Sequence, residues 1–195
     1  MRVANIRRKT NETLIKVKLN IDGTGKSRTV SRIGFFNHLL DTFAKHGLFN
    51  MKAEIRGDTD IDQHHTVEDT GIVLGNAFKT ALGDKKGLKR TGFFIYPMDE
   101  ALVMASIDLS GRPYLRMDSK FRNKKVGDFS TELLEDFFQG FVSALGAALH
   151  IQVYCGRSDH HKIEAIFKAL GKALKEACER EDRLKDDVPS TKGIL

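Results

Sequence analysis

Apolar and polar residues alternate along some stretches of the chain and recur with helical spacing along others. The first alternating stretch covers residues 13–21 and predicts a half-buried strand, because every second side chain is apolar: Ile15, Val17, Leu19 and Ile21. The strand ends at Asp22-Gly23, a turn sequence. The segments predicted next are a helix over 35–46, a strand over 51–55, a polar loop over 56–63 and a helix over about 64–82.

The same order of elements recurs after a polar, glycine-containing break at residues 84–87. The later segments predicted are strands over 93–96 and 101–109, a helix over 133–148, a strand over 150–154 and a helix over 159–178. The halves align in ordered blocks that place Glu12 on Glu100, His38 on Asp136 and Glu68 on Glu164. We therefore predict an α+β fold made by tandem duplication of a β-sheet with two helices, with pseudo-twofold symmetry. The expected parts are residues 1–86, 87–180 and a tail over 181–195.

Each half carries the pattern HHxxE at the start of its second helix. The two copies are His64-His65-Thr66-Val67-Glu68 and His160-His161-Lys162-Ile163-Glu164. Residues four apart share a helix face, whereas adjacent residues diverge by about 100°. Each helix can therefore offer a His/Glu pair to one metal ion and its other histidine to a second ion. A single HHxxE is more often a surface or capping feature, but its recurrence in corresponding places favours metal binding.

Each half also has a candidate ligand near the start of its first helix, His38 in one and Asp136 in the other. Each centre would then have four protein ligands. Nitrogen and oxygen donors without thiolate suit Mn, Fe, Zn, Co or Ni. A six-coordinate ion would keep two positions open, as a catalytic centre requires.

Composition agrees with a globular protein of 195 residues that is 41% hydrophobic and 30% charged. No apolar run reaches the roughly 18 residues of a membrane span, so we expect a cytoplasmic protein with no membrane partner. The two cysteines, Cys155 and Cys178, are too few for a disulfide framework. The net charge of +6 permits an anionic substrate or nucleic acid. The basic residues are scattered without aromatic interleaving, however, so we expect no nucleic-acid partner.

Several further residues suit acid-base chemistry or phosphate binding. Glu12 heads a strand and could act as a general base, with Glu100 as its counterpart in the second half. The tail has a phosphate-binding composition, and basic side chains stand at the repeat junction and in a Ser-Gly-Arg-Pro turn: Arg90, Arg112, Ser190, Thr191 and Lys192. Each alone reads as ordinary surface chemistry, but together with a di-metal centre they favour a small phosphorylated substrate.

Seven stretches that span nearly the whole chain carry a family resemblance: residues 8–13, 34–40, 62–69, 97–102, 108–113, 160–165 and 189–193. With them the chain resembles the imidazoleglycerol-phosphate dehydratase family. The resemblance implies manganese-dependent elimination of water from imidazole glycerol phosphate to give imidazole acetol phosphate in histidine biosynthesis. It also implies two units similar to the second domain of ribosomal protein S5, and a homo-oligomer of 24 subunits with sites between subunits.

The resemblance further implies two manganese ions per subunit. One would be held by His38, His65, His160 and Glu164, and the other by His64, Glu68, His161 and Asp136. Glu12 would act on the proton of the reacting carbon, and the substrate would also contact His38, His64, Arg90, Arg112, His160, Lys168, Ser190, Thr191 and Lys192. Three positions depart from the family pattern: Asp136 replaces a common histidine, Asn37 a common aspartate and Ser158 a common asparagine.

Two other functions fit parts of the sequence. A di-metal phosphohydrolase would use the same ions to bind phosphate and activate water, and it would release inorganic phosphate. A non-catalytic RNA-binding protein would suit the positive charge and S5-like units, with metal-independent affinity that falls steeply with salt. That second function leaves the paired HHxxE sequences unexplained.

Overall fold

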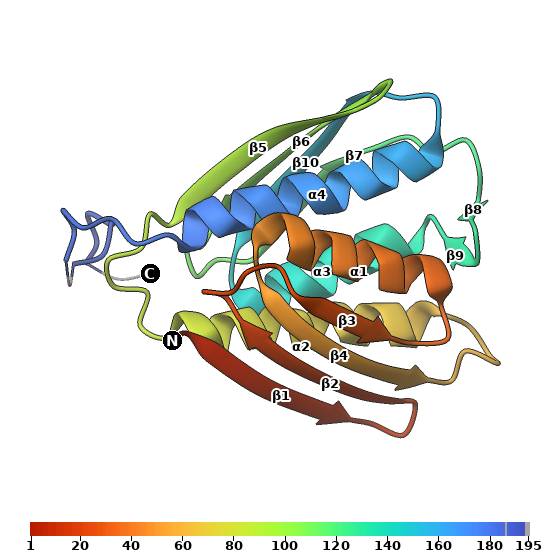
Figure 1. The fold of residues 1–195 in the computed structure, drawn as a ribbon, viewed down its shortest axis with the longest axis horizontal. Helices are drawn as coiled ribbons and strands as arrows, with labels where there is room; N and C mark the ends of the chain where they lie inside the picture. The colour runs from red at the N-terminus through yellow and green to blue at the C-terminus, as the bar shows by residue number, and fades with distance from the viewer. Residues whose placement is uncertain (186, 194–195) are drawn as a thin grey trace.

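Two four-stranded sheets face each other across four long helices in the computed structural model, which describes residues 1–185 and 187–193 (Figure 1). The first half contains β1 (Val3–Lys9), β2 (Thr13–Asn20), β3 (Ser27–Val30), α1 (Gly34–Gly47), β4 (Asn50–Gly57) and α2 (His64–Leu82). Its strand order is β1-β2-β4-β3, with β3 parallel to β4 and the other pairs antiparallel. The side chains of β2 that were predicted to be buried, among them Ile15 and Val17, do face the core.

The second half repeats this topology. It contains β5 (Thr91–Met98), β6 (Ala101–Asp108), β7 (Tyr114–Asp118), α3 (Leu133–Leu145), β10 (Ala148–Cys155) and α4 (Asp159–Cys178). Its strand order is β5-β6-β10-β7, again with only the last pair parallel. A small hairpin of β8 (Lys125–Val126) and β9 (Phe129–Ser130) is added before α3. The predicted α+β duplication is confirmed.

The second helix of each half packs on the first helix of the other half. In α2, a Cβ at Gly75 would lie 2.4 Å from the backbone oxygen of Phe141 in α3. In α4, a Cβ at Gly171 would lie 2.6 Å from the backbone oxygen of Phe43 in α1. Glycine therefore lets both helix pairs approach closely, at corresponding positions of the repeat.

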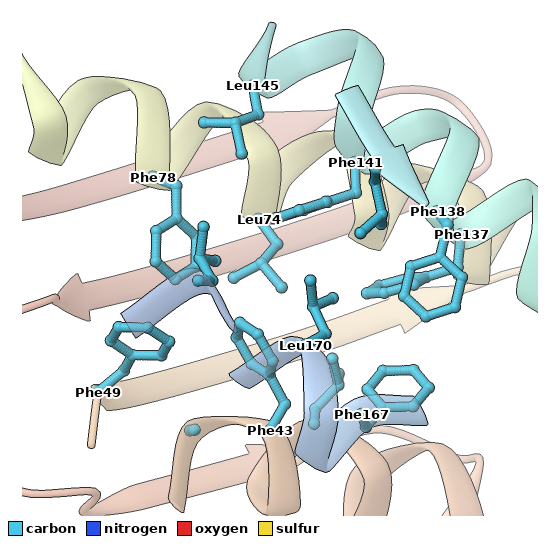
Figure 2. Packing of buried hydrophobic residues seen from close by; sticks show 14 of the residues in the cluster. Phe43, Phe49, Leu74, Phe78, Phe137, Phe138, Phe141, Leu145, Phe167 and Leu170 are labelled. Carbon is cyan, nitrogen blue, oxygen red and sulfur yellow. The ribbon is translucent and has the colours of Figure 1, made fainter. Parts of the chain in front are cut away.

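One hydrophobic core spans both halves (Figure 2). Phe43 and Phe78 of the first half pack with Phe141, Phe167 and Leu170 of the second, and all five are at most 1% exposed. Phe78 meets Phe141 edge-on, with ring centroids 6.1 Å apart. The two repeats thus share one interior, which holds the helix ends that carry the candidate site in place.

Several element boundaries differ from the predictions. The helix predicted over 133–148 ends at Leu145, because Gly146 adopts φ 71° and its N–H closes the helix on the carbonyl of Val142. Ala148 then begins β10 instead of ending the helix. Strands β1, β3 and β7 were not predicted. Among the described residues, no helix is both long enough and apolar enough to cross a membrane.

Candidate metal centres

One cluster of candidate ligands lies where α1 meets the start of α4. His38 Nε2 and His160 Nε2 each lie 3.0 Å from the same atom, Glu164 Oε2. The three ligating atoms all lie within 4.8 Å of one another. The imidazoles are 49% and 47% exposed, whereas the Glu164 side chain is 10% exposed. The helical spacing of His160 and Glu164 and the close α1–α4 contact together bring these groups to one point.

Glu164 is held ionised in this cluster. Burial would raise its pKa, but hydrogen bonds from Lys168 and His38 outweigh burial and lower the pKa to about 2. Lys168 Nζ lies 2.8 Å from Glu164 Oε1. A pocket of about 460 Å³ opens beside the cluster, lined by Gly25, Ser27, Asp41, Thr42, Lys45, His46, Glu164 and Lys168. The cluster is therefore an anionic ligand group at the edge of an accessible pocket.

The corresponding residues of the other repeat lie where α2 meets α3. His64 Nε2 lies 3.7 Å from Glu68 Oε2, and His64 Nδ1 lies 3.4 Å from Asp136 Oδ2. The His64 ring thus stands between the two carboxylates and turns a different nitrogen to each. Asp136 is close enough to join a centre, but this group is looser than the first cluster, because a single ion can use only one nitrogen of the ring.

The second histidine of each HHxxE lies outside these groups. His65 Nδ1 lies 3.0 Å from Asp58 Oδ2 and 3.8 Å from Glu12 Oε2. His161 Nδ1 lies 2.8 Å from Glu100 Oε2, and its Nε2 lies 3.8 Å from Asp99 Oδ2. The His38 group therefore converges within the chain, and the His64 group is brought close together, whereas the expected fourth ligand of each faces elsewhere.

A carboxylate lies beside each of these two histidines, His65 and His161. The hydrogen bond from His161 is the main cause that lowers the pKa of Glu100 to about 2. The hydrogen bond to Asp58 is the main cause that raises the pKa of His65. Glu12, the candidate base, has a 53% exposed side chain beside His65.

The candidate phosphate ligands gather at the opposite end of α4. The Arg90 backbone N–H donates to the carbonyl of Ala177, and its guanidinium donates to the carbonyl of Pro189 at 2.7 Å. Arg90 also forms two hydrogen bonds to Asp108, at 2.7 and 2.9 Å. At 1.5 Å per residue, Ala177 lies about 25 Å along the helix from His160. Arg90 and the tail therefore cannot serve the His38 cluster of the same chain.

The remaining tail and turn candidates make local contacts. Lys192 donates its backbone N–H to Ser190 Oγ at 3.3 Å, and Thr191 lies between them in the exposed tail. Arg112 bonds within its own turn, with its N–H at 3.4 Å from Ser110 Oγ. Of the lysines and arginines predicted to contact the substrate, Lys168 is the one that this chain places at a metal-ligand cluster.

Asp58 contacts a candidate metal ligand, His65, and was not predicted to do so, because residues 56–63 were read only as a polar loop. The available signal was a carboxylate directly after a strand and six positions before His64. In the second half, the capping hydroxyl of Ser158 accepts from the N–H of His161 and starts α4 there.

Comparison with known proteins agrees with this architecture. The family model for imidazoleglycerol-phosphate dehydratase matches residues 31–174. The chain belongs to this family. An imidazoleglycerol-phosphate dehydratase from Caldanaerobacter subterraneus subsp. tengcongensis is 55% identical over 195 residues, all of both chains. One from Caldicellulosiruptor saccharolyticus is 51% identical over 100% of this chain and 98% of the relative.

Solved structures of imidazoleglycerol-phosphate dehydratases share the fold. The Pyrococcus furiosus structure has a TM-score of 0.85 and 36% identity, and the match covers 97% of this chain and 100% of that one. The Staphylococcus aureus structure has a TM-score of 0.82 and 36% identity, with 92% and 99% covered. The resemblance noted in the sequence is therefore confirmed, and family membership makes the chain a dehydratase.

Proposed function

We propose that this dehydratase removes water from imidazole glycerol phosphate to give imidazole acetol phosphate in histidine biosynthesis, with two manganese ions per chain. The observation that carries the proposal is the convergence of His38 Nε2, His160 Nε2 and a Glu164 oxygen within 4.8 Å. Two imidazoles and a carboxylate without thiolate are a donor set that manganese accepts. A bound ion would supply Lewis acidity and a template for the substrate without a redox change.

The ligand sets that we propose combine residues from more than one copy of the chain. His38, His160 and Glu164 would be joined by His65 of another copy, and His64, Glu68 and Asp136 by His161 of another copy. The support is that each chain brings His38, His160 and Glu164 to one point and places His64 beside Glu68 and Asp136. The second histidine of each HHxxE is turned toward other carboxylates. A closed homo-oligomer supplies such exchanges symmetrically, and we propose the 24-subunit assembly implied by the resemblance.

We propose that phosphate binding likewise uses residues of a neighbouring copy of the chain. Arg90, Arg112 and the tail residues Ser190, Thr191 and Lys192 lie at the far end of the molecule from the metal ligands, so they would act on the site of a neighbouring chain. Lys168, beside Glu164, would face the substrate from the chain that holds the metal. Arg and Lys side chains with hydroxyls suit a phosphate group.

Glu12 is proposed to move the proton at the reacting carbon. Its carboxylate is half-exposed and lies beside His65, so it can meet a substrate that is bound at a centre completed by His65. A carboxylate that is held near the substrate contributes typically 10²–10⁴-fold by general acid-base catalysis. His38, His64 and His160 would line the same substrate-binding site. The free thiols Cys155 and Cys178 suit our proposal of a cytoplasmic enzyme. We propose no membrane or nucleic-acid partner.

Metal analysis combined with an activity assay tests the proposal. The purified protein is stripped with chelator, manganese is titrated back, and imidazole acetol phosphate and inorganic phosphate are both measured. We expect activity to vanish on stripping and to return with about two manganese ions per chain. Release of inorganic phosphate without the ketone product would indicate a phosphohydrolase instead. Failure to bind manganese would overturn the proposal.

A further inference from the structure

The two repeats hold the second histidine of HHxxE with different acids. In the second half, His161 Nδ1 contacts Glu100 at 2.8 Å. The repeat counterpart of Glu100 is Glu12, yet Glu12 stays 3.8 Å from His65. Asp58 occupies that place instead, at 3.0 Å from His65 Nδ1. The same imidazole nitrogen therefore meets a carboxylate in both halves, from two unrelated positions.

The lengths of two loops explain why Asp58, and not Glu12, contacts His65. The loop between β10 and α4 covers three residues, 156–158, whereas the loop between β4 and α2 covers six, 58–63. The short loop places the backbone N–H groups of Arg157 and Ser158 on Glu100 Oε1, at 3.2 and 2.7 Å. Both oxygens of Glu100 are thus engaged, one by the loop and one by His161. The long loop leaves Glu12 without the corresponding contacts and supplies its own acid, Asp58.

Gly57 lets this loop lie close to α2. A Cβ at Gly57 would lie 2.0 Å from Thr66 Oγ1, one residue beyond His65. The close approach brings Asp58, which directly follows Gly57, against the first turn of the helix. The Asp58 side chain is 18% exposed, compared with 53% for Glu12. Of the two carboxylates near His65, Asp58 is therefore the one held in place, and Glu12 is the one accessible to a substrate.

We propose that Asp58 is the positioning residue of His65 and thereby frees Glu12 for proton transfer, whereas Glu100 is retained as the positioning residue of His161. This inference rests on the proposed function. A carboxylate that accepts a hydrogen bond from Nδ1–H fixes the imidazole orientation and leaves Nε2 as the nitrogen that can bind a metal ion. Duplication would have produced two equivalent glutamates, and the loop insertion divides their roles: Glu12 meets substrate and Glu100 does not.

Manganese binding distinguishes Asp58 from other acids of its loop. We would titrate manganese into metal-free wild type, Asp58→Ala, Asp58→Asn and the matched control Asp60→Ala, and follow free manganese by electron paramagnetic resonance. Asp60 is on the same loop but has a 90% exposed side chain that pairs with Arg32. We expect one of the two ions per chain to bind 10–100-fold more weakly in Asp58→Ala. Asp58→Asn, which keeps an acceptor oxygen, should lose less, and Asp60→Ala should match wild type.

The two glutamates should then separate in a second comparison. Glu100→Gln should weaken manganese binding, and excess manganese should recover part of its turnover. Glu12→Gln should bind two ions with wild-type affinity and lose about 10²–10⁴-fold in turnover that manganese does not recover. Equal manganese affinity in Asp58→Ala and Asp60→Ala would overturn the role of Asp58. A manganese-independent loss of turnover in Glu100→Gln would overturn the division between the glutamates.

The results for wild type show whether the proposed function or the role of Asp58 has failed. If wild type binds two ions without forming imidazole acetol phosphate, the proposed function fails, and the affinities of the Asp58 variants still decide its positioning role. If wild type binds no manganese, both the function and the inference are overturned.

Discussion

Glu164 has two tasks in this structure, because it is both a candidate metal ligand and the centre of an ion-pair cluster. Lys168 and His38 hold its pKa at about 2, against an ordinary value of 4.5. A depressed carboxyl pKa contributes stability that is fully present above the unfolded-state value and is lost as pH falls toward the folded-state value. Removal of the charge should therefore cost stability near neutral pH but not in acid.

Glu164→Gln should accordingly lower the free energy of unfolding of the chelator-treated protein by about 1–2 kcal/mol at pH 6. The difference from wild type should shrink as pH falls from about 4.5 toward 2. Urea unfolding of both proteins over this pH range measures it. Glu68→Gln is the matched control, since Glu68 holds the equivalent place with a 45% exposed side chain, and it should cost less. If Glu164→Gln lowers the free energy of unfolding as much at pH 2.5 as at pH 6, this account is wrong.

Cys178 should be unreactive toward alkylating reagents in the folded protein. Burial raises the pKa of its thiol to about 12, and the residue is 2% exposed at the end of α4. Thiolate is the reactive form, so alkylation should be slow. Iodoacetamide at pH 8 followed by peptide mass analysis should find Cys178 unlabelled in native protein and labelled after denaturation. Native labelling at the rate of a free peptide thiol would show that the α4 terminus opens.

The close approach of the paired helices depends on glycine. Gly71 lies one turn before Gly75 in α2, and a Cβ there would lie 2.2 Å from the backbone oxygen of Phe137. Backbone atoms of α3 cannot withdraw without separating the two helices, and that separation would also move His64 away from Asp136.

Gly71→Ala should therefore destabilise the protein by about 1–3 kcal/mol, as overpacking does. In an open helix the same change would stabilise by up to about 1 kcal/mol, so the sign of the effect is the test. Thr80→Ala, an exposed position of the same helix, should be neutral or slightly stabilising. Thermal and urea unfolding of the two variants and wild type provide the measurement. A stabilised Gly71→Ala would mean that α2 and α3 are further apart than in this structure.

The elements differ in how well their sequences predict them. The bounds of α2 and α4 were predicted because long helices with regular apolar spacing and a polar start leave little ambiguity. The edge strands β1, β3 and β7 were missed, because they are short or carry basic residues on the outer face, which hides the alternation.

The same distinction applies to the site. The pair His160 and Glu164 follows from helical spacing alone, and the repeat pairing drew attention to His38, which the structure places beside that pair. The contacts of Asp58 with His65 and of Glu100 with His161 depend on loop lengths and on a glycine contact, which involve tertiary structure that no local pattern shows. The distance between Arg90 and the metal ligands likewise emerges only when the helices are assembled.

A site that is shared between copies of the chain should show complementation between inactive variants. His65→Ala lacks the donated histidine, and His38→Ala lacks a member of the receiving cluster. A mixed assembly of these two inactive variants should contain centres that take the cluster from one chain and His65 from the other. Random mixing restores at most about a quarter of the centres, so we expect activity up to about that fraction of wild type after dissociation and joint reassembly.

The control mixture combines His38→Ala with His160→Ala. Both residues belong to one cluster within one chain. Mixed assemblies therefore contain no intact centre of this type, and activity should not return. Recovery in the control, or none in the first mixture, would contradict a centre shared in this way.

The crossed packing of the repeats also bears on how the protein evolved. The His38 cluster takes its ligands from α1 of the first half and α4 of the second, and the His64 group takes them from α2 and α3. A half-length ancestor could have built such groups only as a symmetric dimer, in which both would have been identical. Once gene fusion joined the halves, mutation could change one without the other. The difference between His38 in one group and Asp136 in the other is possible only when both halves belong to one chain.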